Sequence, residues 1–306
     1  MKDLSTVSDE ELLKFFNSFD IVLSDINGVL WNILEGIPGA SDAIKSLKKI
    51  GKKVIVVSNN TTESLDSCHQ QLNASGFDLE KDEIILPTQA MISYLKSQNF
   101  TKSVFILGMP AMKQAFKQAG FKVANNENNT KVNSLQEFGL VTNTDESEIG
   151  ALIVDIDLNI DFVNLQKSVN LLKQPQSIFL VGATNMATPL GLNRVMLGPG
   201  CYLRILEEVS GRKGVQMGKP SPNLNTYIVQ KYGIKDASKV LFIGDSVLAD
   251  MGFATECGYQ KLLVLSGLTK KRDLDVWKFD DKYKPEFYVE SLKVVHELIA
   301  KINKSN

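Results

Sequence analysis

Residues 24–31 read Ser-Asp-Ile-Asn-Gly-Val-Leu-Trp and follow an apolar run, residues 19–23, that predicts a short buried strand. The run ends abruptly at Asp25, and a glycine turn at Gly28 comes soon after. Open α/β sheets bind their ligands at the carboxyl ends of buried strands, in just such polar turns. We therefore expect Asp25 to lie at a functional site of an α/β fold.

The next residues indicate a parallel crossover. Apolar residues at helical spacing between 43 and 50 end at Gly51, and a second apolar strand, residues 53–57, ends in Ser58-Asn59-Asn60. Strand, helix and strand in this order form a βαβ unit, whose two strands are parallel and whose crossover is right-handed. Each strand of the unit ends in polar side chains.

The pattern restarts near residue 101 and returns to its first form near residue 214. Strands are predicted at 104–107, 151–154 and 178–181, a helix at 111–119, and an exposed polar loop at 125–130. A later buried strand, residues 239–243, ends in Gly244-Asp245-Ser246. We predict a doubly wound parallel-sheet core over residues 1–100 and 214–306, with an inserted α/β domain over residues 101–213.

Composition excludes several classes of function. The chain has 34 Lys and Arg against 35 Asp and Glu, so its net charge of -1 gives no reason to expect nucleic acid or an anionic membrane as partner. Apolar stretches are strand-length, shorter than a membrane span, and we do not expect the acidic, polar residues 1–20 to act as a signal peptide. Three widely separated cysteines predict reduced thiols, and we expect a cytoplasmic protein. Two histidines disfavour a histidine-rich metal site or a Ser-His-Asp triad.

The strand-end side chains together suit phosphoryl chemistry. Parallel neighbouring strands would bring Asp25, Asp245 and Asp250 together, and close carboxylates repel each other unless a cation such as Mg²⁺ lies between them. Ser58 and Lys219 beside that cation would form a cradle for a phosphoryl group. Asp25 could then attack phosphorus as a carboxylate nucleophile and form an acyl-phosphate.

Four segments, in this order, resemble the four motifs of the haloacid dehalogenase-like phosphatases. They are Asp25-Ile26-Asn27-Gly28-Val29-Leu30-Trp31, Val57-Ser58-Asn59-Asn60, Gly218-Lys219-Pro220-Ser221-Pro222, and Gly244-Asp245-Ser246 through Asp250. The tryptophan, the Ser-Asn-Asn and the Gly-Lys-Pro-Ser-Pro look like the subgroup of 4-nitrophenylphosphatases, phosphoglycolate phosphatases and pyridoxal phosphate phosphatases. The resemblance covers nearly the whole chain and is weaker in its middle.

The resemblance implies a role for each matching position in the hydrolysis of a small phosphorylated molecule. Asp25 would be the nucleophile and a Mg²⁺ ligand, and Asp245 would bind the same ion. Asn27 would offer the ion its backbone carbonyl, and Asp250 would lie behind the ligands or orient Lys219. Ser58 and Lys219 would hold the phosphoryl oxygens.

The resemblance also extends to the middle of the chain and to the residues around the second motif. Asn59 and Asn60 would lie near the phosphoryl oxygens. The inserted domain would be a cap that selects the leaving group, with Asn185 as a candidate substrate contact. Arg194 could pair with an anionic group of the substrate, although a surface role is as well supported. Relatives commonly dimerise through the cap, so we expect a homodimer.

Asn27 departs from the family, whose first motif has a second Asp at this position. That Asp protonates the leaving alkoxide and then activates water, and an amide can do neither. General acid–base catalysis contributes about 10²–10⁴ in rate, or roughly 3–5 kcal/mol of barrier. We therefore expect metal and phosphate binding to survive and turnover to be slow.

Three explanations of Asn27 stay open: a natural, slow family member, an engineered Asp-to-Asn trap, or deamidation that restores a carboxylate. The natural variant is favoured because residues 199–203, Pro-Gly-Cys-Tyr-Leu, also depart from the family. The function is accordingly a Mg²⁺-dependent phosphatase, with a phosphometabolite-binding pseudophosphatase as the alternative. Retention of the other site residues favours the enzyme.

Asp155 and Asp157 mimic an Asp-x-Asp pair in the inserted domain. They lack the Gly-Val-Leu that follows Asp25-Ile26-Asn27, so a role as caps at the end of a strand is favoured over a second catalytic site.

Overall fold

The structure is a computed structural model that describes all residues except 33–34, 125–130, 144–146, 190–193 and 306. The chain forms two compact units. The first comprises Met1–Ser58, Leu65–Ile85 and Lys219–Asn306, and the second comprises Asn59–Ser64 and Leu86–Gly218.

The expected domain junctions differ from this division in three segments. Residues 59–64, 86–100 and 214–218 fall in the second unit, whereas the sequence placed them in the first. For the last two segments the reason is packing: α4 (Pro87–Ser97) contacts α5 (Pro110–Gln118), and β10 (Val215–Gln216) pairs with β7 (Ile178–Val181).

A seven-stranded sheet forms the centre of the first unit. Its strand order is β1-β13-β12-β11-β2-β3-β4, and every neighbouring pair is parallel. The strands are β1 (Lys2–Asp3), β2 (Ile21–Ser24), β3 (Lys53–Val57), β4 (Ile84–Ile85), β11 (Val240–Gly244), β12 (Gln260–Val264) and β13 (Phe287–Val289). The central strands are buried on both faces, as expected for a parallel sheet covered by helices.

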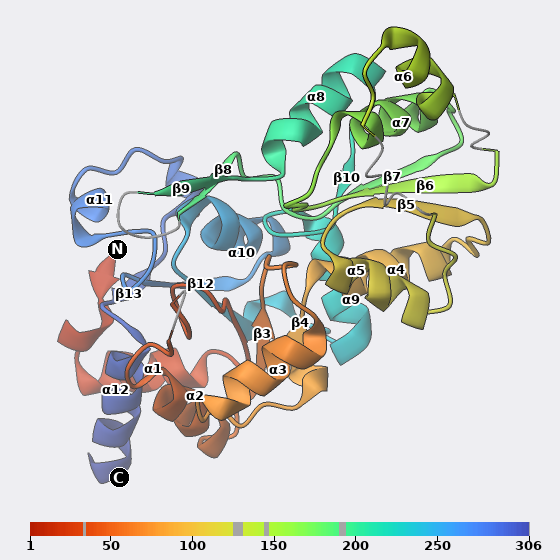
Figure 1. The fold of residues 1–306 in the computed structure, drawn as a ribbon. Helices are drawn as coiled ribbons and strands as arrows, with labels where there is room; N and C mark the ends of the chain where they lie inside the picture. Colours follow the sequence, from red (N-terminus) through yellow and green to blue (C-terminus); the bar gives the residue numbers. More distant parts are fainter. Residues whose placement is uncertain (33–34, 125–130, 144–146, 190–193, 306) are drawn as a thin grey trace. The chain divides into compact units, whose positions relative to one another are not determined.

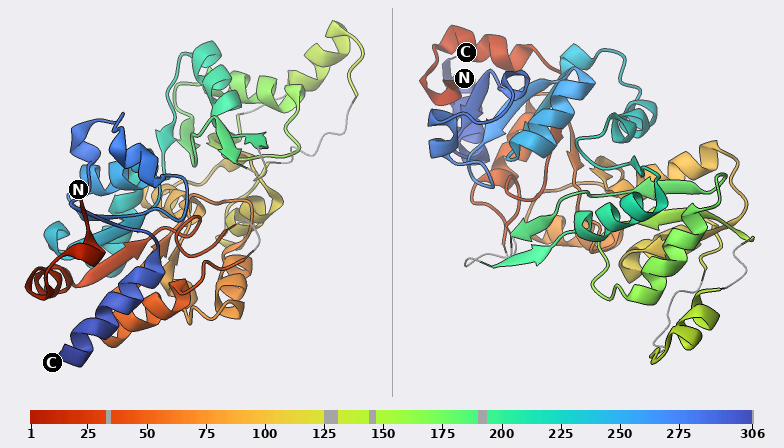
Figure 2. Two further views of the ribbon diagram at one scale, coloured as in Figure 1. Left: turned by 90° about the vertical axis from the view of Figure 1, so that its left-hand side faces the viewer. Right: turned by 90° about the horizontal axis from the view of Figure 1, so that it is seen from above.

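Helices cover both faces of this sheet, so the unit is doubly wound. On one face α1 (Asp9–Asn17) and α2 (Ala40–Lys49) pack against α12 (Leu292–Ser305), and on the other α9 (Pro222–Tyr232) packs against α10 (Gly252–Cys257) (Figure 1). The remaining helices are α3 (Leu65–Ala74) and α11 (Lys271–Asp275). Both chain termini belong to this unit (Figure 2).

The second unit is built on a four-stranded parallel sheet of order β10-β7-β6-β5. Its other strands are β5 (Ser103–Leu107) and β6 (Ile149–Val154). The helices α7 (Phe162–Leu172) and α8 (Gly200–Ser210) pack together on one face, and α4 and α5 pack together on the other (Figure 1). Its apolar core includes Phe105, Leu152, Phe179 and Leu206.

Most predicted elements are present, and the α/β fold class with an inserted α/β unit is confirmed. The strands predicted at 53–57 and 178–181 have those bounds, whereas the loop predicted at 125–130 lies outside the described residues. The prediction missed the helix α6 (Leu135–Thr142), the antiparallel pair of β8 (Ala187–Pro189) and β9 (Val195–Leu197), and β10.

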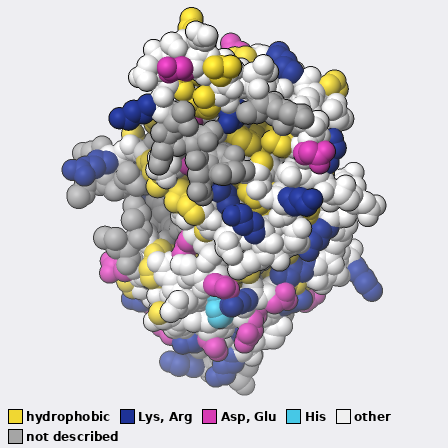
Figure 3. Space-filling model, turned by 45° about the vertical axis from the view of Figure 1, so that its right-hand side comes forward, with side chains coloured by type: hydrophobic (Ala, Val, Ile, Leu, Met, Phe, Trp, Pro, Cys, Tyr) yellow, Lys and Arg dark blue, Asp and Glu magenta, His cyan; other side chains and the backbone are white. Residues whose placement is uncertain are grey.

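Surface charge and helix lengths agree with the composition. Acidic and basic side chains both occur on the face shown in Figure 3, in keeping with the net charge of -1. Within the part of the chain that the structure describes, every helix is too short or too polar to cross a bilayer.

Candidate active site

Three neighbouring strands of the first unit deliver the predicted site residues to one edge of the sheet. The strands β11, β2 and β3 are adjacent, and their last paired residues place Ser24 beside Ile243 and Val56. Asp25, Ser58 and Asp245 each come directly after one of these strands. All three are buried, with exposed fractions of 8%, 1% and 3%.

Lys219 ties this edge together. Its Nζ lies 2.7 Å from Oδ1 of Asp25, 2.8 Å from Oδ1 of Asp250 and 2.9 Å from the carbonyl oxygen of Val57. Burial lowers the pKa of Lys219, but the carboxylates of Asp25 and Asp250 outweigh it, so the pKa is raised above its ordinary value. The side chain is therefore an ammonium, held between two acids.

Asp250 anchors the loop that carries Asp245. Its Oδ2 accepts hydrogen bonds from the backbone N–H groups of Asp245 and Ser246, both at 3.0 Å. It belongs to a π-helical turn, Val247–Met251, whose first residue follows the capping side chain of Ser246. Asp250 thus orients Lys219 through one oxygen and the Asp245 loop through the other.

The three carboxylates form a cluster whose charge is only partly neutralised. One oxygen each of Asp25, Asp245 and Asp250 lies within 4.8 Å of the others. Burial raises the pKa of Asp25 to about 6 against the opposing effect of Lys219. Burial, together with Asp250 and Asp25, raises the pKa of Asp245 to about 8. Three buried acids around one ammonium fit a divalent cation that prefers oxygen ligands.

The residues after Asp25 form a tight turn, residues 25–31, which we call the Asp25 loop. The carbonyl oxygen of Ile26 accepts hydrogen bonds from the N–H groups of Val29, Leu30 and Trp31, at 3.3, 2.8 and 3.0 Å. Gly28 has a φ of +81°, and its N–H donates to the carbonyl oxygen of Trp31 at 2.7 Å. Asn27 stands between these anchors with an exposed side chain.

Three predicted substrate contacts belong to the second unit and stay predictions. Asn59 lies beside Gly218: a Cβ added at Gly218 would be 3.0 Å from Oδ1 of Asn59. Asn60 Oδ1 accepts from the N–H and hydroxyl of Thr62, at 3.0 and 2.6 Å. Asn185 is exposed, and its Nδ2 donates to the Ala187 carbonyl at 3.1 Å.

Asp155 has the expected role of a cap at the end of a strand. It directly follows β6, is 1% exposed, and accepts hydrogen bonds from the N–H groups of Ile156 and Ala183, at 2.6 and 3.3 Å. Burial raises its pKa to about 6, against the lowering effect of the hydrogen bonds from these two N–H groups. It is therefore a structural carboxyl group of the second unit.

Sequence reasoning missed the segment after β12, residues 265–269. The N–H of Leu268 donates to Oδ2 of Asp245 at 2.5 Å, and the hydroxyl of Ser266 donates to the Gly28 carbonyl at 2.7 Å. The signal was present: the apolar run at 262–265 is followed directly by Ser266-Gly267, the same pattern that singled out Asp25 and Ser58.

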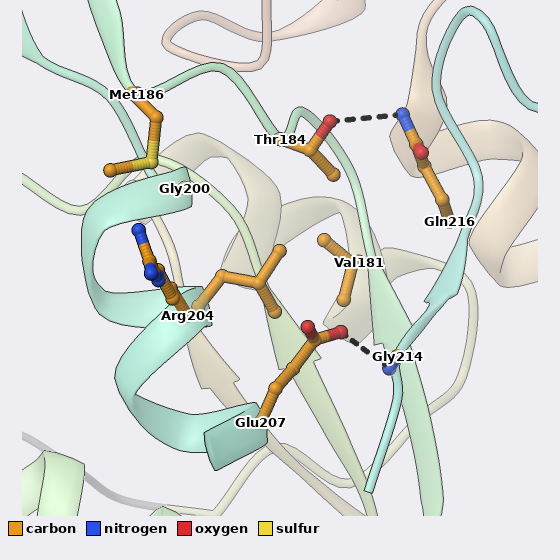
Figure 4. Close-up of a pocket in the computed structure, with 9 residues that line it drawn as sticks. Val181, Thr184, Met186, Gly200, Arg204, Glu207, Gly214 and Gln216 are labelled. Atoms are coloured by element: carbon orange, nitrogen blue, oxygen red, sulfur yellow. Dashed lines mark hydrogen bonds between the residues drawn. The ribbon is translucent and has the colours of Figure 1, made fainter.

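The second unit also contains a pocket of about 300 Å³ between α8, β7 and β10 (Figure 4). Glu207 accepts a hydrogen bond from the Gly214 N–H at 3.1 Å and pairs with Lys213 at 2.6 Å, while Arg204 extends along α8. Thr184 accepts from the Gln216 amide at 3.3 Å. None of the predicted substrate contacts lines this pocket.

Comparison with known proteins gives matches along nearly the whole chain. A family model described as haloacid dehalogenase-like hydrolase matches residues 22–122, and a second HAD-hydrolase-like model matches residues 216–295. The chain is 28% identical to a 4-nitrophenylphosphatase of Schizosaccharomyces pombe over 95% of this chain and 97% of that protein. It is 25% identical to phosphoglycolate phosphatase 2 of Arabidopsis thaliana, over 96% and 97% of the two chains.

A solved structure shows the same fold. The p-nitrophenyl phosphatase from Archaeoglobus fulgidus superposes with a TM-score of 0.79 at 24% identity, covering 92% of this chain and 99% of that one.

Proposed function

Because the chain belongs to the haloacid dehalogenase-like phosphatases, which are phosphoric monoester hydrolases, we propose that it hydrolyses small phosphomonoesters through a phosphoryl intermediate on Asp25. The observation that carries this proposal is the buried ion pair between Asp25 and Lys219 beside the carboxylates of Asp245 and Asp250. A surface pair would be commonplace, whereas a buried charge cluster at the ends of three strands is costly unless it has a chemical role.

In the proposed reaction, an oxygen of Asp25 attacks phosphorus and the bond from phosphorus to the ester oxygen breaks. The leaving alkoxide takes the bonding pair and needs a proton. Water then attacks the phosphorus of the acyl-phosphate, which frees the Asp25 carboxylate and inorganic phosphate. The Lys219 ammonium and the Ser58 hydroxyl would hold phosphoryl oxygens and stabilise the charge that develops on them.

Mg²⁺ would be held by Asp25, Asp245 and the backbone carbonyl of Asn27, with Asp250 behind them. When bound, the ion neutralises charge on the phosphoryl oxygens. The excess of carboxylates over cations in the cluster supports this choice of ligands.

Asn27 would limit both steps. An amide neither protonates the leaving alkoxide nor takes a proton from the attacking water, so each step would lose about 10²–10⁴ in rate. The loss should be smaller for 4-nitrophenyl phosphate, because nitrophenolate leaves without a proton. Hydrolysis of the intermediate would then be the slower step, and phosphorylated Asp25 would accumulate.

Stopped-flow measurement of nitrophenolate release tests this. The unaltered chain should give a burst of about one nitrophenolate per protein followed by slow turnover. Asn27→Asp should raise steady-state turnover by about 10²–10⁴ and remove the burst. Asp25→Asn is the control, since it should give neither burst nor turnover.

Two results would change the conclusion. Fast turnover by the unaltered chain, equal to that of Asn27→Asp, would contradict the role given to residue 27. Turnover in Asn27→Asp, with neither burst nor turnover in the unaltered chain, would favour the second candidate, a phosphometabolite-binding pseudophosphatase. The exposed amide at position 27 is the observation in favour of that candidate.

The substrate within the class of small phosphomonoesters would follow from a screen of phosphorylated metabolites. A homodimer formed through the second unit stays a prediction, which light scattering on the purified chain would test.

A further inference from the structure

Residues 265–269, which follow β12, contact both sides of the proposed cation site. On one side the N–H of Leu268 donates to Oδ2 of Asp245 at 2.5 Å, and the N–H of Thr269 donates to the Asp245 carbonyl oxygen at 3.0 Å. On the other side the Ser266 hydroxyl donates to the carbonyl oxygen of Gly28 at 2.7 Å. The segment therefore joins the Asp25 loop to the loop that carries Asp245.

Two glycines allow an unusually close approach at this junction. A Cβ added at Gly267 would lie 1.8 Å from Oδ2 of Asp245, and one added at Gly28 would lie 2.3 Å from the same oxygen. The Cα of Gly267 would itself be 2.9 Å from a Cβ at Gly28. Because these groups are in contact, a small displacement of the Asp25 loop against residues 265–269 must move the carboxylate of Asp245.

The hydrogen bonds of Gly28 also fix the direction of the Asn27 carbonyl. The Asn27 carbonyl and the Gly28 N–H belong to one planar peptide group, and that N–H donates to the Trp31 carbonyl oxygen. The Gly28 carbonyl, in the next peptide group, is held by Ser266. Trp31 and Ser266 thus hold the two peptide groups on either side of Gly28.

We propose that Ser266 is a positioning residue, whose bond to Gly28 sets the Asn27 carbonyl at the correct distance from the Asp245 carboxylate for binding a divalent cation. The hydroxyl touches neither substrate nor cation and acts through Gly28. The proposal rests on the cation site of the proposed function, and it predicts an effect on cation affinity that does not depend on turnover.

The direct test measures Mg²⁺ affinity by titration calorimetry on the full chain without substrate. Ser266→Ala should raise the dissociation constant for Mg²⁺ about tenfold. Mutation of residues that orient metal ligands usually weakens metal binding by about 10–100-fold. Ser266→Thr, which keeps the hydroxyl, should bind Mg²⁺ as the unaltered chain does. Mg²⁺ affinity within twofold of the unaltered value in Ser266→Ala would overturn the proposal.

Ser18→Ala is the matched control. The Ser18 hydroxyl also donates to a backbone carbonyl oxygen, that of Phe15, at 2.7 Å, and it is partly buried in the same unit. Ser18→Ala should leave Mg²⁺ affinity unchanged. A tenfold loss of affinity in Ser18→Ala would show that the loss of any serine hydrogen bond has the same effect, and would overturn the specific role of Ser266. If Ser266→Ala does not fold, Ser266→Cys, a weaker donor of similar size, answers the same question.

Turnover separates this inference from the proposed function. At saturating Mg²⁺, Ser266→Ala should regain most of kcat with an unchanged KM, because the bound ion itself holds the loop. Mg²⁺ binding that weakens in Ser266→Ala, in a chain that hydrolyses no phosphomonoester, would contradict the proposed function and support this inference. Equal Mg²⁺ affinity in an active enzyme would overturn this inference alone.

Discussion

The Nζ of Lys219 lies 2.7 Å from Oδ1 of Asp25, although 194 positions separate the two residues in the chain. Both residues are buried: the exposed fractions of their side chains alone, without the backbone, are 2% for Lys219 and 11% for Asp25. A buried pair of this kind is costly to form and more costly to break, because removal of one partner leaves the other charge without compensation. The stability of the first unit and the chemistry of its site therefore depend on the same contact.

Lys219→Met should lower the free energy of unfolding by about 3–5 kcal/mol, because Asp25 and Asp250 lose their buried counter-charge. It should also abolish phosphatase activity. Urea denaturation measures the first effect and 4-nitrophenyl phosphate hydrolysis the second. Lys2→Met is the control: Lys2 pairs with Glu11 at 2.7 Å on the surface, where solvent screens the pair, so its loss should lower stability far less. Equal losses in the two variants would contradict the importance of burial.

Gly28→Ala should destroy Mg²⁺ binding, because its Cβ would lie 2.3 Å from Oδ2 of Asp245. Gly51→Ala separates this contact from backbone strain. Gly51 has nearly the same φ, +82° against +81°, but an added Cβ there meets nothing within 4 Å. Both variants should lose about 1–2 kcal/mol of stability from the left-handed conformation. Mg²⁺ titration should show a loss in Gly28→Ala alone, and intact binding in that variant would contradict the packing argument.

Mg²⁺ should stabilise the chain, because the cation separates the carboxylates of Asp25, Asp245 and Asp250. At 100 times the dissociation constant, the gain should be about 2.7 kcal/mol, and EDTA should remove it. Asp245→Asn should be more stable than the unaltered chain in EDTA and should lose the Mg²⁺ effect. Asp42→Asn, at an exposed helical position, is the control. Thermal unfolding with Mg²⁺ or EDTA measures all three, and an undiminished Mg²⁺ effect in Asp245→Asn would remove Asp245 from the ligands.

Asp155 should make stability fall as the pH rises from about 4 to about 6. Burial raises its folded pKa from 3.8 to about 6. As the pH rises across that interval, the unfolded chain releases this proton before the folded chain does, so the free energy of the unfolded chain falls relative to that of the folded chain. Above pH 6 the cost is constant, at about 3 kcal/mol. The stability of Asp155→Asn relative to the unaltered chain should therefore rise by about that amount between pH 4 and pH 7.

Urea denaturation at several pH values measures the effect of Asp155. Asp157→Asn, two residues further along the chain and only half-buried, is the matched control. The same change in the control would contradict the assignment to Asp155, and so would a constant difference between Asp155→Asn and the unaltered chain.

The sequence located the strand ends that carry the candidate site, but not the packing that divides the chain into two units. Asp25, Ser58 and Asp245 could be found because each follows an apolar strand, and parallel neighbouring strands place such residues at one edge. The short strands β8, β9 and β10 were missed, because two- and three-residue strands carry no periodic signal. The helix α6 was missed as well. Residues 86–100, which the sequence placed in the core, group with the second unit because the packing of α4 on α5 is a tertiary contact.

By itself the sequence determined the βαβ order, the polar strand ends and the presence of an amide, Asn27, two residues after Asp25, since all of these are local patterns of residue type. Only the tertiary structure decided which groups meet. Lys219 lies between Asp25 and Asp250. Ser266 bonds to Gly28, and Leu268 bonds to Asp245. The physical reason is that hydrogen bonds and ion pairs form over about 3 Å. Residues far apart in the chain reach that distance only when the sheet order and the packing of its loops are in place.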